Sequence, residues 1–394
     1  MIRNIRVRNF KSLRDVSLKL GRRNVFIGPN MAGKSNLVSV FRFLTQMVRS
    51  SPGLYGLPNA ISSQGGFAEL AWRGDESNLL TISLDGDFEG IDNPLQAEVW
   101  RYELEILGDR QRGTAIVQNE TLSLSGAAGE TSLVGRDPAG SRRSLLSPSL
   151  GKVTEVPDSN RSALEFEVPS WEGNVFREFF ASFQFYKLIP AVMKQVNPAI
   201  APGFLEETGS NLSSWLLMLQ TRHPESFARI GSVLKDVLPD VASLFTWPTA
   251  QSTVFVASSE RFLRTPVPVW QMSDGELCFI AFLSLVFAPS GLGAPLFCVE
   301  EPEDHLHPKL IEALIGLHDQ RQQELGARAA QVLVTTHSPY LVDKVGVDDV
   351  IVVEKREGAT MCTRPVDKPA LRELLTREEI GLGDLMYSGA LGGK

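Results

Sequence analysis

The feature that most constrains the fold is a glycine-rich loop between an apolar strand and an amphipathic helix. Residues 28–35 read GPNMAGKS and match the pattern G-x-x-x-x-G-K-[ST], directly after the apolar run VFI. The glycines let backbone N–H groups close around a phosphate, Lys34 places a cation on the β and γ oxygens, and Ser35 offers a hydroxyl to Mg²⁺. The strand–loop–helix context argues against the alternative, a glycine-rich turn without a ligand. We call residues 28–35 the phosphate loop.

Composition indicates a folded protein in a reducing compartment. The chain has 394 residues, of which 43% are hydrophobic and 22% charged, as in an ordinary globular protein of one large unit or a few smaller ones. Its three cysteines are far apart and show neither a disulfide framework nor zinc-ligand spacing. The N-terminus lacks a signal-peptide core, and the longest apolar run, residues 277–288, is too short to span a bilayer. We therefore expect a cytoplasmic protein without membrane contact.

Charge is distributed unevenly along the chain. The net charge of −7 excludes a global basic field for nucleic acid. Residues 1–23, however, carry eight basic side chains and only one acidic side chain, Asp15, a local charge of +7. This basic segment is compatible with a DNA contact and equally with the solvated face of a sheet.

Hydrophobic periodicity divides the chain into β-rich and helical regions. Residues 2–20 alternate as a half-buried hairpin does, and residues 37–48 place apolar side chains on one face of a helix. Residues 100–107 (WRYELEIL) alternate in the same way before a turn at GDRQRG, whereas Gly, Ser and Pro punctuate residues 124–160, which predicts a mobile loop. Within residues 190–245, NLSSWLLMLQ and ESFARIGSVLKDVLPDV are predicted as amphipathic helices, followed by strands near TVFVAS and TPVPVW.

A second motif follows the apolar strand LFCV at residues 296–299. This strand ends in the adjacent carboxylates Glu300 and Glu301. In a parallel sheet, ligands bind beyond the carboxyl ends of the strands, and successive strand residues face opposite ways. We therefore assign Glu300 to Mg²⁺ and Glu301 to the water that attacks the phosphate. The alternative interpretation, a solvated acidic turn, is less favoured because the same chain has a phosphate loop.

A third motif places a histidine at the end of the next predicted strand. His337 follows VLVTT, and a helix from Pro308 to about Leu325, ended by Gly326, lies between the two strands. Strand, helix, strand in this order predicts a right-handed parallel crossover, which brings His337 to the edge that carries Glu301. An imidazole there can hydrogen-bond a γ-phosphate, whereas the alternative is a structural histidine.

A fourth motif is the MSDGE turn, residues 272–276, which precedes a strongly apolar stretch. Ser273 and Glu276 have the S-x-x-E spacing of a helix capping box. Capping does not exclude phosphate binding, because Gly275 and the helix N-terminus still present N–H donors. The turn has no lysine and no strand at phosphate-loop spacing, so it cannot be a second complete nucleotide site.

The four motifs, in this order, resemble those of the ABC-type ATPases. FKSLRDVSLKL with FIGPNMAGKSN, EEPEDHLHP and TTHSPYLVD resemble in particular the RecF/SMC-like branch close to the OLD-family ATPases, which includes many bacterial ATPases of repair and phage-defence operons. The resemblance covers nearly the whole chain and implies ATP and Mg²⁺ as cofactors. It also implies that the MSDGE turn of one subunit closes on the nucleotide of another, which would explain two phosphate-binding elements in one chain.

The resemblance transfers nucleotide contacts and metal ligands to this sequence. The implied nucleotide contacts are Asn30, Gly33, Lys34, Ser35 and Asn36, with Ser273, Gly275 and Glu276 from the MSDGE turn. The implied metal ligands are Ser35 and Glu300, and Gln64 in SSQGG is the candidate for the Mg²⁺-sensing glutamine, against the alternative of a plain loop residue. Glu300 stands where many relatives have Asp, so its carboxylate reaches one methylene further.

Other positions depart from the family pattern. Met31 stands where relatives usually have Gly, which concerns the backbone of the phosphate loop, and DGE at residues 274–276 replaces the transporter-type GGQ. His305 and His307 in EPEDHLHP are compatible with metal ligation, whereas the resemblance implies a dimer-contact loop.

Together these features predict an α/β fold, an ABC-type P-loop ATPase head with a β-rich sub-domain and a compact helical lobe. We expect an N-terminal ATPase lobe with the phosphate loop at 1–84, a β-rich insertion at 85–189, a helical lobe at 190–262 and a C-terminal ATPase lobe at 263–394. The last lobe holds the MSDGE turn (signature), the carboxylate strand (Walker B) and the histidine switch. About 50 residues follow TTHSPYLVD, predicted as the hairpin VIVVEKREGATMCTRP and one helix, too few for the Toprim nuclease domain of OLD-family nucleases.

Two functions from different classes fit these expectations. The first is an ATPase that forms a head-to-head homodimer or higher oligomer on ATP and acts in DNA repair, recombination or anti-phage defence, with DNA as a partner. The second is a nucleotide-dependent regulatory scaffold that holds or releases a separate effector, such as a nuclease or toxin, with slow ATP turnover. DNA-stimulated ATPase activity would favour the first, and co-purification with the product of a neighbouring gene the second. The RecF-like ends and EEPEDHLHP disfavour a transporter ATPase.

Overall fold

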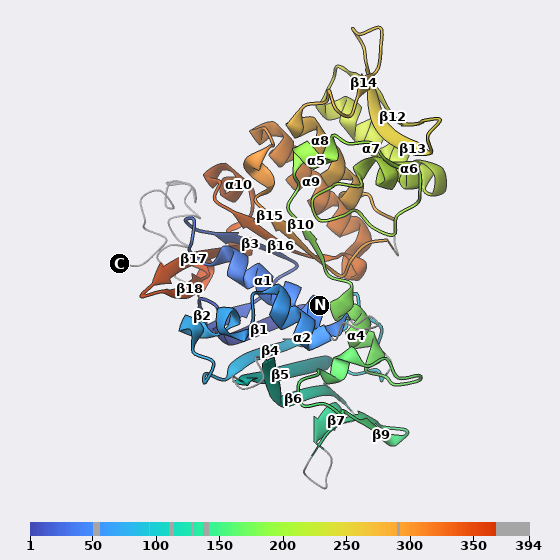
Figure 1. The fold of residues 1–394 in the computed structure, drawn as a ribbon. Coiled ribbons are helices and arrows are strands. Elements are labelled where there is room, and N and C mark those ends of the chain that lie inside the picture. The colour runs from blue at the N-terminus through green and yellow to red at the C-terminus, as the bar shows by residue number, and fades with distance from the viewer. Residues whose placement is uncertain are drawn as a thin grey trace.

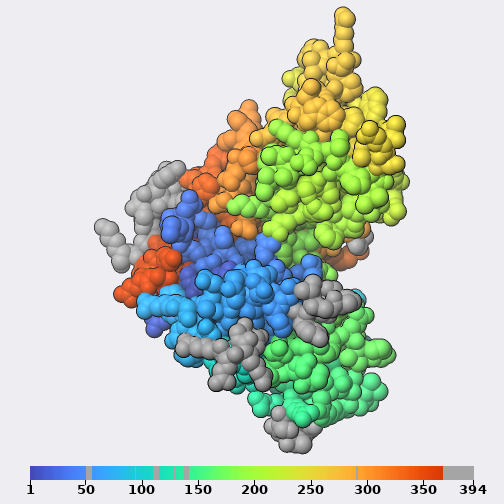
Figure 2. All heavy atoms as spheres, viewed as in Figure 1, coloured from blue at the N-terminus to red at the C-terminus, as the bar shows by residue number. Residues whose placement is uncertain are grey.

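Three sheets, with helices packed on and between them, build the chain (Figure 1). The computed structural model describes residues 1–49, 56–93, 95–109, 114–127, 129–136, 142–289 and 292–367. A large antiparallel sheet lies at one end of the molecule, a mainly parallel sheet in the middle, and a small sheet with its helices at the other end. Figure 2 shows the same order, because the teal-green and the yellow segments occupy opposite ends of the space-filling view.

The first sheet is antiparallel and has the strand order β2-β1-β4-β5-β6-β7-β8-β9. Its strands are β1 (Ile2–Phe10), β2 (Leu13–Lys19), β4 (Leu80–Gly86), β5 (Val99–Asp109), β6 (Thr114–Gly126), β7 (Gly129–Arg136), β8 (Arg143–Ser147) and β9 (Gly151–Glu155). The predicted hairpin over residues 2–20 is confirmed, with Val7 opposite Val16. The predicted alternation in β5 is also confirmed, because its inward side chains are fully buried: Trp100, Tyr102, Leu104 and Ile106.

Aromatic side chains of helix α4 (Asn174–Ala181) cover the inward face of β5. The Trp100 ring meets the Phe176 ring edge-to-face at a centroid distance of 5.6 Å, and Tyr102 lies 5.4 Å from Phe180. Aromatic pairs in these geometries add to the free energy gained by burial alone. The pairing explains why a strand with charged outward positions stays fixed in the N-terminal core.

Residues 124–160 were predicted as a mobile loop, and this prediction is wrong where the structure describes them. They complete β6 and form β7, β8 and β9. The segment is held in the sheet by pairing of β8 with β7 and β9, and a buried side-chain contact also joins β8 to β6. The carboxylate of Glu120, itself 1% exposed, accepts hydrogen bonds from Arg143 Nη1 at 2.7 Å and from Ser162 Oγ at 2.6 Å. Buried polar groups are tolerated when they are paired in this way. Most of the predicted GDRQRG turn, residues 110–113, lies outside the described residues.

The second sheet carries the phosphate loop and is parallel apart from its last strand, in the order β10-β15-β16-β3-β17-β18. Its strands are β3 (Arg23–Ile27), β10 (Gln184–Tyr186), β15 (Leu296–Glu300), β16 (Gln331–Thr336), β17 (Val350–Arg356) and β18 (Ala359–Thr363). Strands β15 and β16 are parallel neighbours joined by α9 (Pro308–Leu325), as the sequence predicts, and α9 is capped by Gly326 at φ +56°. The hairpin β17–β18 is confirmed, and the helix predicted after it lies outside the described residues.

Further helices lie on both sides of the parallel sheet, beside the first sheet and at the far end of the molecule. They are α1 (Lys34–Val48), α2 (Gly56–Ser63), α3 (Phe67–Leu70), α5 (Pro190–Met193), α6 (Leu212–Arg222), α7 (Pro224–Val237), α8 (Asp274–Val286) and α10 (Pro339–Lys344). A small sheet of β11 (Asn197–Pro198), β12 (Val241–Pro248), β13 (Thr253–Glu260) and β14 (Val267–Pro268) packs with α6 and α7. Both predicted helices are therefore confirmed. The helix α7 is amphipathic, with Ile230 and Leu234 as its buried residues, whereas α6 is buried on nearly all sides over residues 212–219 and is not amphipathic there.

The predicted α/β fold class, with a β-rich part and a helical part, is confirmed. The expected boundary between residues 84 and 85 falls inside β4, which pairs with β1 and β5, so the first sheet runs across it. The division into four units stays a proposal. Within the described part of the chain, none of the helices combines the length and apolar character needed to cross a membrane.

Candidate nucleotide site

The phosphate loop joins β3 to α1 and packs against the hairpin β17–β18. A Cβ on Gly28 would lie 2.0 Å from Val353 O, and a Cβ on Gly33 would lie 2.0 Å from Thr360 Oγ1, so a side chain fits at neither position without a shift. Gly33 has φ +108°, and Met31 has φ +66° although it carries a side chain. Glycine adopts such a conformation at lower cost. The loop therefore keeps a left-handed backbone at Met31, where the sequence departs from glycine.

The ammonium group of Lys34 lies inside the loop. Lys34 is 6% exposed, and its Nζ donates to Gly28 O at 2.7 Å and to Pro29 O at 3.1 Å. Burial lowers the pKa of Lys34, and the negative charges of Glu301 and Glu303 act in the opposite direction. Two backbone carbonyls are weak partners for a buried cation, so phosphate oxygens can replace them with a gain in free energy.

Asn36, two residues after Lys34, takes part in hydrogen bonds that hold the phosphate loop. Asn36 Nδ2 donates to Ser12 Oγ at 2.6 Å, and this hydroxyl lies 2.6 Å from Thr360 Oγ1, which donates to Ala32 O at 2.9 Å. The structure thus places the Asn36 side chain in a chain of hydrogen bonds that holds the loop. Asn30, another predicted nucleotide contact, is exposed.

The sheet order brings three strand ends together. β16 pairs with both β15 and β3, with Thr335 opposite Glu300 and Thr336 opposite Ile27. Since the three strands are parallel, their carboxyl ends meet at one edge of the sheet, where ligands of α/β proteins bind. The phosphate loop, the carboxylate strand and the histidine strand therefore share an edge although β3 is distant in sequence.

Glu300 faces helix α1. Its side chain is 15% exposed, and its Oε1 lies 3.6 Å from Arg42 Nη2. Arg42 is itself held by Glu207 through hydrogen bonds of 2.6 and 2.8 Å, and its guanidinium lies over the Phe185 ring. Glu300 therefore has a fixed cation beside it.

Glu301 lies in the left-handed region at φ +46° and faces a different set of neighbours. Its Oε1 is 3.6 Å from His337 Nδ1, and its Oε2 is 4.0 Å from Lys187 Nζ. A non-glycine residue in this conformation stores strain, which is found most often at functional sites. The two adjacent carboxylates thus have separate partners, as predicted, but the reason is the left-handed turn at Glu301 and not strand alternation, because β15 ends at Glu300.

Two acidic residues at this edge were not predicted from the sequence. Ligand atoms of Glu301, Asp304 and His337 lie within 4.8 Å of one another, a separation at which they could share a metal ion. The Glu303 side chain is 8% exposed and lies 3.5 Å from His337 Nδ1. Both follow Glu301 in the run EEPED, where a 3-10 turn brings residues three apart onto one side. The closely spaced acidic residues of EEPED were the sequence feature from which Glu303 and Asp304 could have been predicted as site residues.

Ser35 and Gln64, two of the predicted metal ligands, lie near the same helix. Ser35 is exposed, and its carbonyl accepts a hydrogen bond from Ser39 Oγ at 2.8 Å. Gln64 Oε1 accepts a hydrogen bond from Lys11 Nζ at 2.7 Å, and Lys11 also reaches Ser39 at 3.4 Å. The structure brings Gln64 close to α1 through Lys11, and no hydrogen bond between described residues joins it to Glu300.

The MSDGE turn forms the N-terminus of α8 as the capping box predicts. Ser273 Oγ accepts a hydrogen bond from Glu276 N at 3.2 Å. Burial, together with the nearby charge of Glu260, raises the pKa of Glu276. Asp274 is paired with Lys194 at 2.6 Å. No hydrogen bond or ion pair between described residues joins this turn to the phosphate loop of the same chain.

The turn packs instead against the loop that holds His305 and His307. A Cβ on Gly275 would lie 2.8 Å from His305 O. His307 caps α9, since its Nδ1 accepts a hydrogen bond from Lys309 N at 3.3 Å. A cavity of about 380 Å³ lies between the two segments and is lined by Ser273, Gly275, Glu276, His305 and His307 among others. Neither histidine belongs to the group of three possible metal ligands found among the described residues.

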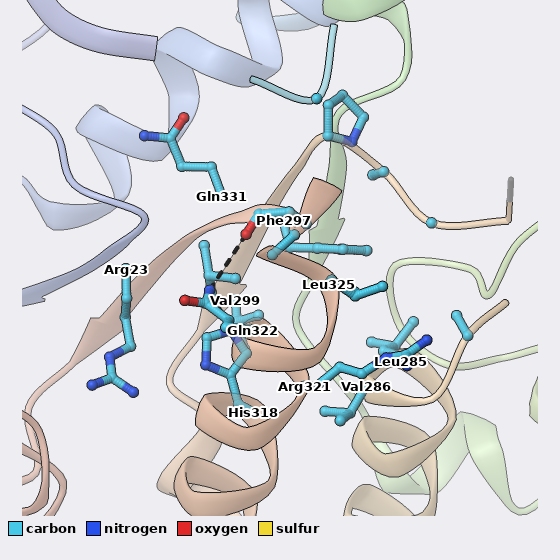
Figure 3. A pocket seen from close by; sticks show the side chains of 18 of the residues that line it. Arg23, Leu285, Val286, Phe297, Val299, His318, Arg321, Gln322, Leu325 and Gln331 are labelled. Carbon is cyan, nitrogen blue, oxygen red and sulfur yellow. Dashed lines mark hydrogen bonds between the residues drawn. The ribbon is translucent and has the colours of Figure 1, made fainter. Parts of the chain in front are cut away.

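A second cavity, of about 740 Å³, lies under β15 and β16 between the sheet and α9 (Figure 3). Val299 and Val334 line it, together with Leu285, Phe297 and Leu325. Glu300 and Thr335 are absent from its lining, in keeping with the alternation of side chains along a strand. Its mainly apolar wall is unsuited to a triphosphate, so this cavity is separate from the candidate nucleotide site.

Two regions of the chain match known ATPase domain families. Residues 1–106, which contain the phosphate loop, match the family described as "AAA ATPase domain". Residues 217–343, which contain the MSDGE turn, the carboxylates and His337, match the family described as "AAA domain, putative AbiEii toxin, Type IV TA system". No curated protein sequence matches the chain.

Solved structures of SMC head domains share the fold. The SMC head bound to the C-terminal winged-helix domain of ScpA matches with a TM-score of 0.58 and 13% identity, over 92% of this chain and 96% of that chain. The Smc head with an extended coiled coil, bound to a ScpA domain derived from Pyrococcus furiosus, matches with a TM-score of 0.54 and 10% identity, over 95% and 99% of the two chains. The chain therefore has the fold of SMC head domains, and two of its regions are similar to AAA ATPase domain families, which supports an ABC/SMC-like nucleotide-binding ATPase.

Proposed function

We propose that the chain binds ATP with Mg²⁺ at the phosphate loop and hydrolyses it. The observation that supports this best is the shared edge of β3, β15 and β16, where Lys34, Glu301 and His337 approach one another. The buried ammonium of Lys34 suits the β and γ oxygens of ATP. Glu301 suits the orientation or deprotonation of the attacking water, and His337 a hydrogen bond to the γ-phosphate.

We assign Mg²⁺ to Ser35 and Glu300. A hydroxyl and a carboxylate are the hard oxygen ligands that Mg²⁺ prefers, whereas the group of three ligands that includes His337 offers a nitrogen and suits transition metals better. When bound, Mg²⁺ would neutralise charge that develops on the phosphates. Gln64 can join this set only if its hydrogen bond to Lys11 opens.

We further propose that two copies close head-to-head, so that the MSDGE turn of one copy completes the ATP site of the other. Within one chain, no hydrogen bond or ion pair of the described residues joins this turn to the phosphate loop. Ser273 and Asp274 are exposed, as is Met31 of the phosphate loop, which is 85% exposed. Both elements are therefore accessible to a second copy.

Mixing two inactive variants tests the shared site. Ser273→Arg should leave ATP binding intact but block closure, because a long cation would fill the space of the γ-phosphate, and Lys34→Ala should remove ATP binding. Each homodimer should be inactive. In a heterodimer one composite site combines both defects, while the other combines an intact phosphate loop with an intact MSDGE turn. We expect a co-expressed one-to-one mixture to regain about a quarter of wild-type phosphate release, if one good site turns over alone.

The mixture needs a proof of dimer formation, which tandem purification on two different tags provides. Recovery of activity in the purified heterodimer would support a site made by two chains. Ser273→Arg protein that is fully active alone would rule out a phosphate role for the MSDGE turn and leave only its capping function. Ser273→Ala serves as the control for the lost cap, because it removes the hydroxyl without adding the cation.

We propose anti-phage defence, or DNA repair and recombination, as the biological role, in line with the resemblance to OLD-family-like ATPases. The description of the family that matches residues 217–343 names a type IV toxin–antitoxin system, which favours defence. The same description also favours the second candidate, a regulatory scaffold whose nucleotide state holds or frees a separate effector. Co-purification of a toxin or nuclease that is released on ATP hydrolysis would support the scaffold.

DNA binding, the lower-ranked partner proposal, rests on the basic N-terminal segment. Acidic side chains neutralise part of the positive charge of this segment. Arg3 and Arg22 pair with Glu89, and Arg23 pairs with Asp349. Three other basic residues, Arg6, Arg8 and Arg14, lie on β1 and β2 with exposed side chains, and the first two share Asp15 as a partner.

Reversal of Arg6, Arg8 and Arg14 to Glu should therefore weaken DNA binding and flatten its salt dependence. If each side chain meets one phosphate, the slope of log K against log salt should fall by about 0.9 per contact. Fluorescence anisotropy with labelled duplex at several salt concentrations measures both quantities. The reversal of Lys235, Arg261 and Arg264, three exposed residues of the helical end, is the control of equal charge change. Wild-type protein that binds no DNA even at low salt would end the DNA proposal.

A further inference from the structure

A buried carboxylate lies between the two candidate catalytic groups. Glu303 belongs to the 3-10 turn η3 (Pro302–Asp304) and is 8% exposed at its side chain, compared with 26% for Glu301. Removing a carboxylate from water costs several kcal/mol unless the protein supplies hydrogen bonds. The hydrogen-bond partners of Glu303 therefore show which part of the structure the buried carboxylate stabilises.

One oxygen of Glu303 accepts three hydrogen bonds from the residues at the carboxyl end of β16. Its Oε1 accepts hydrogen bonds from Thr336 Oγ1 at 2.5 Å, from His337 N at 2.9 Å and from Ser338 N at 3.2 Å. Hydrogen bonds to an ionised acceptor are shorter and about twice as strong as neutral ones. Because two of the three donors are backbone groups, the carboxylate fixes the path of the chain at His337. The helix α10 starts directly after these residues, with Ser338 as its cap.

The same turn is attached to β16 at a second point. Glu301 N donates to Thr335 O at 2.8 Å, so residues 301–303 are anchored on both sides of Thr336. The imidazole of His337 then lies 3.6 Å from Glu301 Oε1 and 3.5 Å from Glu303 Oε1. The regular pairing of β15 with β16 stops at Glu300 and Thr335, and beyond that point these side-chain bonds set the separation of Glu301 and His337.

We infer that Glu303 is a positioning residue of the ATP site, which ties the histidine loop to the turn that carries Glu301 and so keeps both groups aligned on the γ-phosphate. This inference rests on the proposed ATPase function. Its energetic basis is preorganisation, since a displacement of about 1 Å at such a site can cost about 100-fold in rate. Glu303 need not touch the nucleotide for this role.

The second oxygen of Glu303 guides the choice of variants. Glu303 Oε2 is buried and has no hydrogen-bond partner among the described residues. A glutamine at this position can keep the acceptor oxygen on its three donors and place its amide nitrogen where Oε2 lies. Glu303→Gln therefore preserves the bonds, in weaker form, while Glu303→Ala removes all three.

The test compares kcat for ATP, the Kd of ATP and the thermal midpoint in Glu303→Ala, Glu303→Gln and the wild type. We expect Glu303→Ala to lower kcat about 10- to 100-fold with a Kd close to wild type, and Glu303→Gln to restore most of kcat. The matched control is Glu165→Ala. Glu165 is another buried carboxylate with one unpartnered oxygen, which accepts from Gly56 N and Arg161 away from the site, and its loss should lower stability without changing kcat of the folded protein.

Thr336→Val provides a second route if Glu303→Ala fails to fold. It removes one of the three donors, keeps the side-chain shape, and should lower kcat several-fold without a change in Kd. Wild-type kcat in a folded Glu303→Ala or Thr336→Val protein would overturn the inference, as would a Glu303→Gln protein no better than Glu303→Ala. Wild-type protein that hydrolyses no ATP would instead overturn the proposed function, and this inference with it.

Discussion

Replacement of Lys34 with alanine should abolish tight ATP binding. The ammonium is buried in the phosphate loop, where two backbone carbonyls accept its hydrogen bonds, and β- and γ-phosphate oxygens can replace these carbonyls with stronger, charge-assisted bonds. Losing them should raise the Kd of ATP about 100-fold or more. Titration with a fluorescent ATP analogue, with Mg²⁺ present, measures this directly.

The variant must be shown to fold, because Lys34→Ala also removes two hydrogen bonds from the loop. Circular dichroism and the thermal midpoint serve this purpose, and Lys235→Ala, which alters an exposed lysine of α7, controls for the loss of a positive charge. An ATP affinity equal to that of the wild type would exclude the phosphate loop as the nucleotide site.

Replacement of Glu301 with glutamine should stop hydrolysis and leave ATP binding intact. The amide keeps the size of the side chain but cannot take a proton from the attacking water, and general-base catalysis contributes up to about 10,000-fold to a rate. We expect kcat to fall about 1,000-fold and an ATP-bound dimer to accumulate. Phosphate release and light scattering after size-exclusion chromatography follow the two effects.

Glu300→Gln should behave differently, since Glu300 is assigned to Mg²⁺. It should weaken the Mg²⁺-dependent part of ATP binding while leaving Mg²⁺-independent binding unchanged. Glu312→Gln, on the exposed face of α9 and paired with Lys344, makes the same chemical change away from the site and should alter neither property. If Glu300→Gln trapped an ATP-bound dimer and Glu301→Gln lost Mg²⁺-dependent binding, the two roles would have to be exchanged.

Features that depend on neighbouring residues could be predicted from the sequence. The phosphate loop, the hairpin β1–β2 and the end of α9 at Gly326 follow from glycine conformation and from apolar periodicity, which are local properties. Two motifs on strands joined by one helix predicted the parallel pair β15–β16, because the crossover rule leaves few alternatives. The α/β fold class therefore followed from order and spacing.

The partners of individual side chains could not be predicted in this way. Asn36 and Gln64 stay predicted contacts of the nucleotide and of Mg²⁺. The hydrogen bonds that the structure gives them, to Ser12 and Lys11 at the turn of the β1–β2 hairpin, could not be predicted from the sequence. Glu303 was absent from the predicted site, because its role depends on donors at the end of a different strand. Such hydrogen bonds leave no periodic signal in the chain.

The sequence by itself determined which chemical groups stand at the ends of β3, β15 and β16, and in what order. Only the tertiary structure decided that β3 lies beside β16, which brings Lys34 into the field of Glu301 and Glu303. It also decided that β7, β8 and β9 form within a segment rich in Gly, Ser and Pro, because these strands pair with one another and with β6, and the buried pair Arg143–Glu120 joins β8 to β6. The physical reason is the same in both cases, since non-local pairing and burial outweigh the weak local preferences of a segment.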